Sequence, residues 1–154
     1  NLKDDELIIN VQGDEPFIDP VDIDNLAALA KIEEACMVTL FSSLKENELQ
    51  DQNVVKLWMK SETVVSDFAR DINHMEPAKA KKHIGIYAYR VKALKEISRC
   101  PVTNLEEIEK LEQLRPLWLG INIAVEVAHK EPYMSVDTYD DLEKVRKHFI
   151  TVKS

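Results

Sequence analysis

The stretch IINVQGDEP, residues 8–16, decides how the rest of the sequence is interpreted. It continues a short apolar run over residues 7–11, which is typical of a strand buried on both faces. The run ends in Gly13 and two adjacent carboxylates, Asp14 and Glu15. Glycine lets the backbone turn tightly or approach a ligand closely. The stretch therefore predicts a buried strand that ends either in a ligand-binding turn or in a simple polar turn before a helix.

Patterns typical of strands and helices alternate along the rest of the chain. Asp19 is placed to cap a helix that begins at Pro20, because proline is favoured in the first helical position. Further strands are expected over residues 35–41, 53–59, 63–68, 84–89 and 121–128, and further helices over residues 44–50, 91–98, 104–119 and 139–149. The alternation predicts an α/β fold with a mixed, mostly parallel sheet flanked by helices. No linker or repeat divides the sequence, which predicts a single domain.

Two of the helices carry clear end signals. Residues 104–119 place apolar side chains on one helical face, with Asn104 as the cap and Gly120 as the stop. Thr138, with Asp141 three residues later, forms a capping-box-like start for the last helix.

The composition excludes several classes of function. The net charge is −8, with 28 Asp and Glu against 20 Lys and Arg, whereas nucleic-acid or anionic-membrane binding needs a basic footprint. No apolar run approaches the roughly 20 residues of a membrane-spanning helix. The start of the chain, NLKDDELIIN, is too acidic for a signal peptide. An acidic chain that handles an anionic substrate needs metal ions or locally placed Lys and Arg.

Two acids are candidates for a metal site. In open α/β sheets, ligands bind beyond the carboxyl ends of the strands, which is where Asp14 is expected to lie. Asp137 also follows a predicted strand and precedes a predicted helix. Two carboxylates from different strand ends can hold one Mg²⁺ that steers a nucleoside triphosphate. Each acid alone also fits a turn or a helix cap, and the residues leave both alternatives open.

Other polar residues are weaker candidates. His83 precedes the run over residues 84–89 and Tyr87 lies within it, while Glu112 and Gln113 lie at the boundary of an apolar helical face. Packing and solvated-surface roles also explain these positions. The three glycines do not form a glycine-rich phosphate loop such as GxxxxGK[ST]. The residues alone thus predict an α/β domain with a candidate Mg²⁺ site and no nucleotide-binding loop.

Five segments together resemble one family, the 3-deoxy-manno-octulosonate cytidylyltransferases (CMP-Kdo synthetases). In chain order they are IINVQGDEPFIDP, NVVK, HIGIYAYR, NLEEIEKLEQLRPLWLG and VDTYDDLEKVR. The resemblance runs from Leu7 to about Lys147. QGDEP and LEQLR make it specific, because the related CMP-sialic acid synthetases lack that pair.

The resemblance implies a nucleotide-diphospho-sugar-transferase-like fold and a cytoplasmic, dimeric enzyme that uses Mg²⁺. The implied reaction joins CTP to the sugar acid Kdo, gives CMP-Kdo for lipopolysaccharide synthesis and releases pyrophosphate. The anomeric hydroxyl of the sugar attacks the α-phosphorus of CTP, and catalysis is mostly positioning and charge neutralisation. The implied partners are CTP, Kdo and a second copy of the chain, with no nucleic acid and no membrane.

The resemblance also implies roles for eight residues. Asp14 and Asp137 match the Mg²⁺ ligands and are the implied catalytic pair. Arg70 matches an arginine whose positive charge can meet the sugar carboxylate. The residues that match the sugar pocket are Gln12, His83, Tyr87, Glu112 and Gln113. Their polar side chains suit a polyhydroxylated ligand, because each hydroxyl needs a directed partner.

The chain departs from the family pattern around Arg70. Where the family has YFSR, the chain reads Asp67-Phe68-Ala69-Arg70, and the segment over residues 71–82 is shorter than usual. The tyrosine and serine side chains of the family motif are therefore replaced. These changes bear on sugar recognition, and they leave open a related 2-keto sugar acid, such as an 8-amino Kdo, as the substrate.

Family members begin with a βα unit whose Gly/Arg/Lys-rich loop holds the triphosphate, and these 154 residues do not include it. Residues 1–154 are then a single partial domain with the sugar and metal site and the dimerisation region. We expect this chain by itself not to turn over CTP. A non-catalytic sugar-binding or dimerisation module is the alternative from another functional class, although such a module needs neither QGDEP nor LEQLR.

Overall fold

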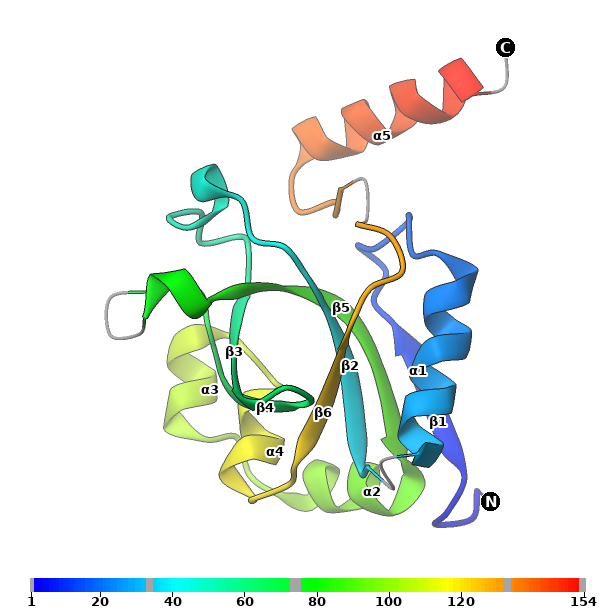
Figure 1. Ribbon diagram of the computed structural model, residues 1–154, viewed down its shortest axis with the longest axis vertical. Helices are drawn as coiled ribbons and strands as arrows, with labels where there is room; N and C mark the ends of the chain where they lie inside the picture. Colours follow the sequence, from blue (N-terminus) through cyan, green and yellow to red (C-terminus); the bar gives the residue numbers. More distant parts are fainter. Residues whose placement is uncertain (1, 33–34, 73–75, 132–133, 153–154) are drawn as a thin grey trace.

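Six strands form one sheet at the centre of the computed structural model, which describes residues 2–32, 35–72, 76–131 and 134–152 (Figure 1). Their order across the sheet is β1-β5-β2-β6-β4-β3, and β3 also pairs with β5. The strands are β1 (Leu7–Val11), β2 (Met37–Ser42), β3 (Lys56–Ser61), β4 (Val64–Ala69), β5 (Lys81–Arg90) and β6 (Ile123–Val127). Every strand expected from the sequence is present, with its ends shifted by three residues at most.

The helices begin largely where the capping signals predict. They are α1 (Pro20–Ile32), α2 (Val91–Arg99), α3 (Asn104–Glu109), α4 (Leu114–Trp118) and α5 (Tyr139–Val152), with 3-10 turns at Glu46–Glu48 and Pro77–Lys79. Asp19 Oδ1 caps α1 by accepting a hydrogen bond from the Val21 N–H at 2.9 Å. Thr138 Oγ1 accepts from the Asp141 N–H at 3.2 Å, which confirms the capping box of α5. The short helix expected after β2 is only a 3-10 turn.

The sheet is mostly antiparallel, so the prediction of a mostly parallel sheet is wrong. Among the described strands only β2 and β6 pair in parallel, and the other five pairings are antiparallel. The difference arises because β5 runs back between β1 and β2 and pairs with both. β1, β2 and β6 nevertheless point the same way, so their carboxyl ends meet at one edge of the sheet (Figure 1).

Strand β1 is not buried on both faces, contrary to the prediction from its apolar run. It lies at the edge of the sheet and pairs with β5 from Leu7, opposite Arg90, to Val11, opposite Ile86. Its first three residues are half-buried, and Val11 is 40% exposed. A strand with a neighbour on one side only is covered less completely than a central strand.

Alternating side chains on the strands divide most of the core into two hydrophobic clusters, one on each face of the sheet, and a third, smaller cluster contains Trp58, Ile72 and Ala80. On β6, Ile123 belongs to one cluster and Ala124 to the other. The first cluster includes Leu114 of α4, and the second includes Leu26 of α1. Full burial of an aliphatic side chain contributes about 1.5–3 kcal/mol. The two helices therefore cover opposite faces, and the sheet is the middle of three layers.

The single helix predicted over residues 104–119 is two helices, α3 and α4. Lys110 ends α3 in the left-handed backbone conformation, with φ 56° and ψ 44°. This conformation costs a residue with a Cβ atom about 1–2 kcal/mol. Leu111 and Leu114, each 3% exposed, pack into the core on either side of the turn. Their burial offsets the cost of the left-handed conformation at Lys110. The regular spacing of apolar residues does not reveal this break between the two helices.

The start of α3 also differs from the prediction. Its cap is Thr103, not Asn104, because Thr103 Oγ1 accepts a hydrogen bond from the Glu106 N–H at 3.2 Å. Leu105 and Ile108 of this helix are 52% and 75% exposed, although the periodic pattern predicts that they face the core. The break at the end of α3 explains this, since the two halves of the pattern no longer lie on one continuous face.

The last helix, α5, extends beyond the sheet edge at which β1, β2 and β6 end (Figure 1). Phe17, which follows the QGDEP turn, stacks on Phe149 of this helix with ring centroids 5.2 Å apart. Phe17 also lies edge-on to His148, again with centroids 5.2 Å apart. These contacts connect the loop after β1 with the C-terminal helix. Within the described residues, every helix is too short or too polar to cross a membrane.

Candidate functional site

A cavity of about 780 Å³ opens at the sheet edge where β1, β2 and β6 end, and it continues between β5 and the α3–α4 turn. Its lining includes all eight residues to which the family resemblance gives a role, namely Gln12, Asp14, Arg70, His83, Tyr87, Glu112, Gln113 and Asp137. They come from five segments: the turn after β1, the end of β4, strand β5, the α3–α4 turn and the segment before α5. A cavity of this size suits a small-molecule ligand.

Gly85 of β5 holds the turn that follows β1. Its carbonyl accepts a hydrogen bond from the Gln12 N–H at 3.0 Å, and its N–H donates to Glu15 Oε1 at 3.3 Å. A Cβ atom at this position would lie 2.2 Å from Gln12 Oε1 and 3.2 Å from Glu15 Cγ. Any larger residue at Gly85 would therefore force the Gln12 side chain to move.

Gly13 does not have the conformational role predicted for it. Its φ is not positive, since Gly120 is the glycine with positive φ in the described part of the chain. A Cβ atom on Gly13 would meet nothing within 4 Å. The turn therefore forms without glycine's special freedom, and a close approach by a ligand stays a prediction.

Two hydrogen bonds hold the segment before α5 against the QGDEP turn. The Val136 N–H donates to the Asp14 carbonyl at 2.8 Å. The Ser135 hydroxyl donates to Glu15 Oε1 at 2.9 Å. Asp137 follows directly in the chain, so these bonds bring the second candidate acid to the same end of the cavity as the first.

Asp14 and Asp137 lie close enough to repel each other electrostatically. Partial desolvation is the main cause that raises the pKa of the Asp137 carboxyl, and the negative charge of Asp14 raises it further. Nucleotide-binding sites commonly hold Mg²⁺ through one or two carboxylates, with waters and substrate phosphates as the other ligands. This pair fits that pattern. The described residues include no group of three or more His, Cys, Asp or Glu side chains that could hold a metal by themselves.

His83 is buried and neutral. It is 8% exposed, and burial lowers its pKa to about 3. Thr39 Oγ1 lies 2.9 Å from His83 Nε2 and 2.8 Å from the Ile86 carbonyl oxygen. Because the single hydroxyl proton of Thr39 is donated to the carbonyl, the contact with His83 requires a proton on Nε2. The neutral ring then has Nδ1 as its hydrogen-bond acceptor.

Two tyrosines of β5 keep their phenol protons. Burial is the main cause that raises the pKa of Tyr87 and of Tyr89, and the Glu112 carboxylate raises both further. The Tyr87 ring lies between those of His83 and Tyr89, with centroids 5.3 and 5.7 Å away. Phenols that stay protonated can donate hydrogen bonds to ligand oxygens.

Backbone carbonyls anchor Arg70 at the end of β4. Its Nε–H donates to the Glu109 carbonyl at 3.0 Å, and its Nη1 donates to the Gln52 carbonyl at 2.8 Å. Lys56 is fully buried, and its Nζ donates to the carbonyls of Arg70 at 2.9 Å and Asp51 at 2.5 Å. The guanidinium of Arg70 thus donates to backbone carbonyls, and its charge also acts on the Asp137 carboxyl, where it opposes the rise in pKa that desolvation mainly causes. Arg70 therefore brings a positive charge to the cavity that can meet an anionic group.

The departures from the family motif at Asp67 and Ala69 do not reach the cavity, since neither is among the described residues that line it. Asp67 Oδ1 instead accepts a hydrogen bond from the Phe68 N–H at 2.8 Å, within β4. Of the DFAR sequence, Arg70 alone contributes to the described cavity lining. Residues 73–75, in the segment predicted to be shortened, lie outside the described residues.

Comparison with known proteins places this chain in a family. A family model described as cytidylyltransferase matches residues 1–123. The chain belongs to the cytidylyltransferase family. Among curated members, 3-deoxy-manno-octulosonate cytidylyltransferase of Histophilus somni (strain 2336) is 40% identical over 163 residues, covering 94% of this chain and 64% of that protein. The protein of the same name from Tolumonas auensis is 40% identical over 162 residues, covering 97% of this chain and 64% of its own length.

A solved structure also supports membership of the chain in the cytidylyltransferase family. CMP:2-keto-3-deoxy-manno-octonic acid synthetase complexed with CTP is similar with a TM-score of 0.84 and 33% identity, covering 94% of this chain and 62% of that one. The chain thus spans just under two thirds of the length of these relatives. The resemblance of the chain to the 3-deoxy-manno-octulosonate cytidylyltransferases is confirmed, and so is the α/β nucleotidyltransferase-like fold.

Further residues of this cytidylyltransferase family member form or support the cavity wall, although the sequence gives little indication of this role. Glu15 bridges Gly85 and Ser135, and its position next to Asp14 is the only sequence hint of that role. Lys56, the lysine of NVVK, is not among the described residues that line the cavity, but it supports one of them, because its Nζ donates a hydrogen bond to the Arg70 carbonyl. Two ion pairs of 2.8 Å also line the cavity, namely Lys45–Glu131 and Lys82–Glu48.

Burial of His83 should make stability depend on pH. The unfolded chain, with a histidine pKa of about 6.5, binds more protons than the folded chain below that pH. The free energy of unfolding therefore falls as the pH falls from about 6.5 toward the folded pKa of about 3. At pH 5 this loss amounts to about 2 kcal/mol.

Urea unfolding at pH 7.5 and pH 5 measures this loss. The variant His83→Gln should lose about 2 kcal/mol less on acidification than the wild type does. The exposed His129→Gln serves as the control and should keep the wild-type dependence. Identical pH dependence in His83→Gln and the wild type would contradict the assignment of a neutral buried histidine.

Proposed function

We propose that the protein to which this chain belongs is a 3-deoxy-manno-octulosonate cytidylyltransferase that joins CTP to Kdo and releases pyrophosphate. One observation carries the proposal: the eight residues matched by family resemblance, from five separate segments, line a single cavity. Relatives of that name are 40% identical across nearly all of this chain. Because the chain spans only 64% of those relatives, the activity is proposed for the intact protein. Its product would supply lipopolysaccharide synthesis.

The described residues offer a polar wall for a polyhydroxylated acid. Arg70 presents a positive charge to the sugar carboxylate. Neutral His83 offers a hydrogen-bond acceptor, and the protonated phenol of Tyr87 offers a donor. Glu112 and Gln113 add a carboxylate and an amide from the α3–α4 turn. A site of directed donors and acceptors rejects an analogue that lacks a hydroxyl, because buried polar groups are then left unpaired.

The proposed reaction depends on how this wall orients the sugar. The anomeric hydroxyl oxygen attacks the α-phosphorus of CTP and forms a new P–O bond. The bond between the α-phosphorus and the oxygen that bridges it to the β-phosphate breaks, and pyrophosphate leaves. Holding the sugar beside the nucleotide makes the attack effectively unimolecular. Asp14 and Asp137 would hold Mg²⁺, whose contribution when bound is to neutralise charge on the phosphates.

We propose three further properties of the intact protein. A βα unit with a Gly/Arg/Lys-rich loop precedes this chain and binds the triphosphate, and the protein works as a homodimer in the cytoplasm. The family resemblance supports all three. The net charge of −8 supports the first, because so acidic a segment needs a separate source of positive charge to bind a triphosphate.

Removing either candidate metal ligand should weaken binding of the metal–nucleotide complex. Asp14→Asn and Asp137→Asn each keep the side-chain size but remove a negative charge. In the intact protein, calorimetric titration should show affinity for Mg²⁺–CTP falling by about tenfold or more. Asp24→Asn, which changes an exposed acid on α1, is the matched control and should bind like the wild type. Binding at wild-type affinity by both site variants would rule out this metal site.

The isolated 154-residue chain should not release pyrophosphate from CTP and Kdo, because the proposed triphosphate loop lies outside it. A coupled pyrophosphate assay on the purified chain tests this, with the intact protein as the positive control. Adding a companion fragment that carries the loop should restore release. Turnover by the chain alone would refute a separate triphosphate-binding unit.

The close contact between Gly85 and Gln12 should appear in the kinetics of the intact protein. Gly85→Ala should displace the Gln12 side chain and raise KM for Kdo by about tenfold. Gln12→Ala should have a similar effect. In the double variant, Gly85→Ala should add little, because the side chain that it displaces is already gone. Fully additive effects would mean that the two residues act independently.

A further inference from the structure

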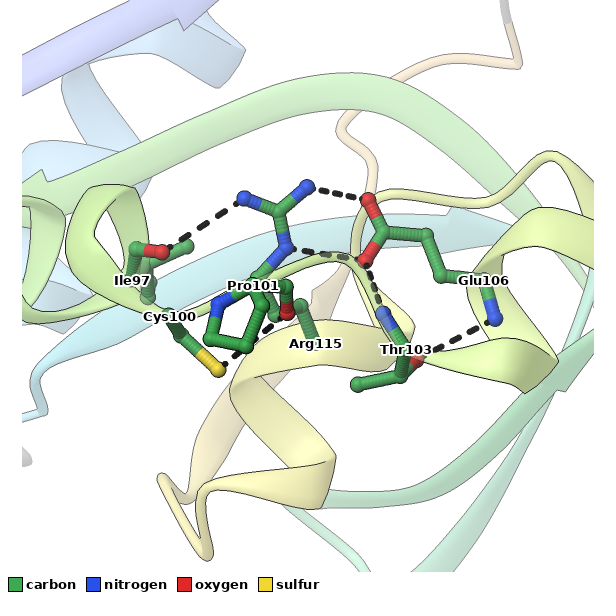
Figure 2. A network of polar contacts seen from close by, with 6 residues as sticks. All are labelled: Ile97, Cys100, Pro101, Thr103, Glu106 and Arg115. Carbon is green, nitrogen blue, oxygen red and sulfur yellow. Dashed lines mark hydrogen bonds and ion pairs between the residues drawn. The ribbon is translucent and has the colours of Figure 1, made fainter.

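We propose that Arg115 and Glu106 are positioning residues, whose ion pair fixes the turn that presents Glu112 and Gln113 to the sugar acid. The inference rests on the proposed function for the identity of the ligand. Figure 2 shows the Arg115 guanidinium of α4 directed at the Glu106 carboxylate of α3. Nε–H donates to Oε2 at 2.8 Å, and Nη2 donates to Oε1.

The ion pair is largely buried, and it is joined to one further helix, α2, and to the N-cap of α3. Only 6% of the Glu106 side chain and 17% of the Arg115 side chain are exposed. Arg115 Nη1 also contacts the Ile97 carbonyl of α2 at 3.5 Å, and Glu106 Oε2 accepts from the Thr103 N–H at 3.4 Å (Figure 2). A two-pronged Arg–carboxylate contact sets angle as well as distance. The pair therefore fixes the relative positions of α2, α3 and α4.

The pair spans a turn that local preference disfavours. Lys110 is left-handed there, with φ 56°, which residues with a Cβ atom avoid. The Lys110 N–H donates to the Glu106 carbonyl at 2.8 Å, and the Arg115 N–H donates to the Glu112 carbonyl at 3.1 Å. Glu106 and Arg115 thus hold the turn through their backbones on both sides and through their side chains across it.

The far end of α3 is tied to Arg70. The Glu109 carbonyl accepts from Arg70 Nε–H at 3.0 Å, and Glu109 Oε2 accepts from the Arg70 backbone N–H at 3.0 Å. α3 has six residues, so it links the ion pair directly to the residue proposed to meet the sugar carboxylate. Movement of α3 would displace Arg70, Glu112 and Gln113 together. The structure therefore couples the ion pair to the sugar half of the cavity.

A purely structural ion pair would behave differently. Its loss would lower thermal stability and reduce activity toward both substrates alike. The chain offers a matched control in Arg146 and Glu143 of α5, an exposed pair with Nη1 and Oε1 2.6 Å apart. Substitutions in this control change the net charge in the same way without touching the α3–α4 turn.

The test compares Glu106→Gln and Arg115→Lys with Glu143→Gln and Arg146→Lys in the intact protein, with Kdo and CTP varied separately. Both site variants should raise KM for Kdo on the order of 10- to 100-fold and leave KM for CTP unchanged. Arg115→Lys keeps the positive charge but lacks the two parallel N–H donors of the guanidinium. Its rise in KM for Kdo should therefore be smaller than that of Arg115→Met, which removes the charge as well, but it should not return to the wild-type value. The control variants should match the wild type.

Hydrogen exchange gives a second readout that needs no substrate. Glu106→Gln should speed exchange at the N–H groups of Lys110 and Arg115, while those of β5 stay protected. Equal rises in KM for both substrates, or unchanged exchange at the turn, would overturn the proposal. A wild-type protein that is inactive with Kdo would refute the proposed function instead, and exchange at the turn would still decide whether the ion pair holds it.

Discussion

Strand β5 runs antiparallel between β1 and β2, and the site depends on the missing side chain at Gly85 in that strand. Both backbone groups of Gly85 are used by the turn after β1, the carbonyl by Gln12 and the N–H by Glu15. A Cβ atom would occupy the place of the Gln12 side chain. The central strands therefore place the QGDEP turn, and Gly13 contributes no conformational constraint to it.

The second part of the site is built on that turn. Ser135 and Val136 bond to Glu15 and to the Asp14 carbonyl, which brings Asp137 to the cavity. These contacts join residues that are about 120 positions apart in the chain. A two-carboxylate site can form here only because the segment before α5 returns across the end of β1.

Short-range signals predicted much of the fold, and long-range contacts account for what they missed. The capping box of Thr138 acts within four residues, so the sequence reveals it. An apolar run does not show whether a strand runs parallel or antiparallel to its neighbours, which is why the prediction of a mostly parallel sheet is wrong. The helical spacing of apolar residues also continues past Lys110, so it predicts one helix. In the structure the chain turns at Lys110, and Leu111 and Leu114 are buried on either side of the turn. The bond of Glu15 to Gly85, 70 positions away, leaves no pattern in the sequence.

Charge divides the cavity into two chemically different parts. Asp14 and Asp137 take part in none of the ion pairs between described residues, so their repulsion favours a cation. The wall formed by His83 and Tyr87 is neutral, because burial disfavours the charged form of both side chains. A neutral wall recognises hydroxyls by direction, and Arg70 adds one fixed positive charge. Under the proposed function, sugar binding should vary little across physiological pH, because neither His83 nor Tyr87 changes its charge in that range.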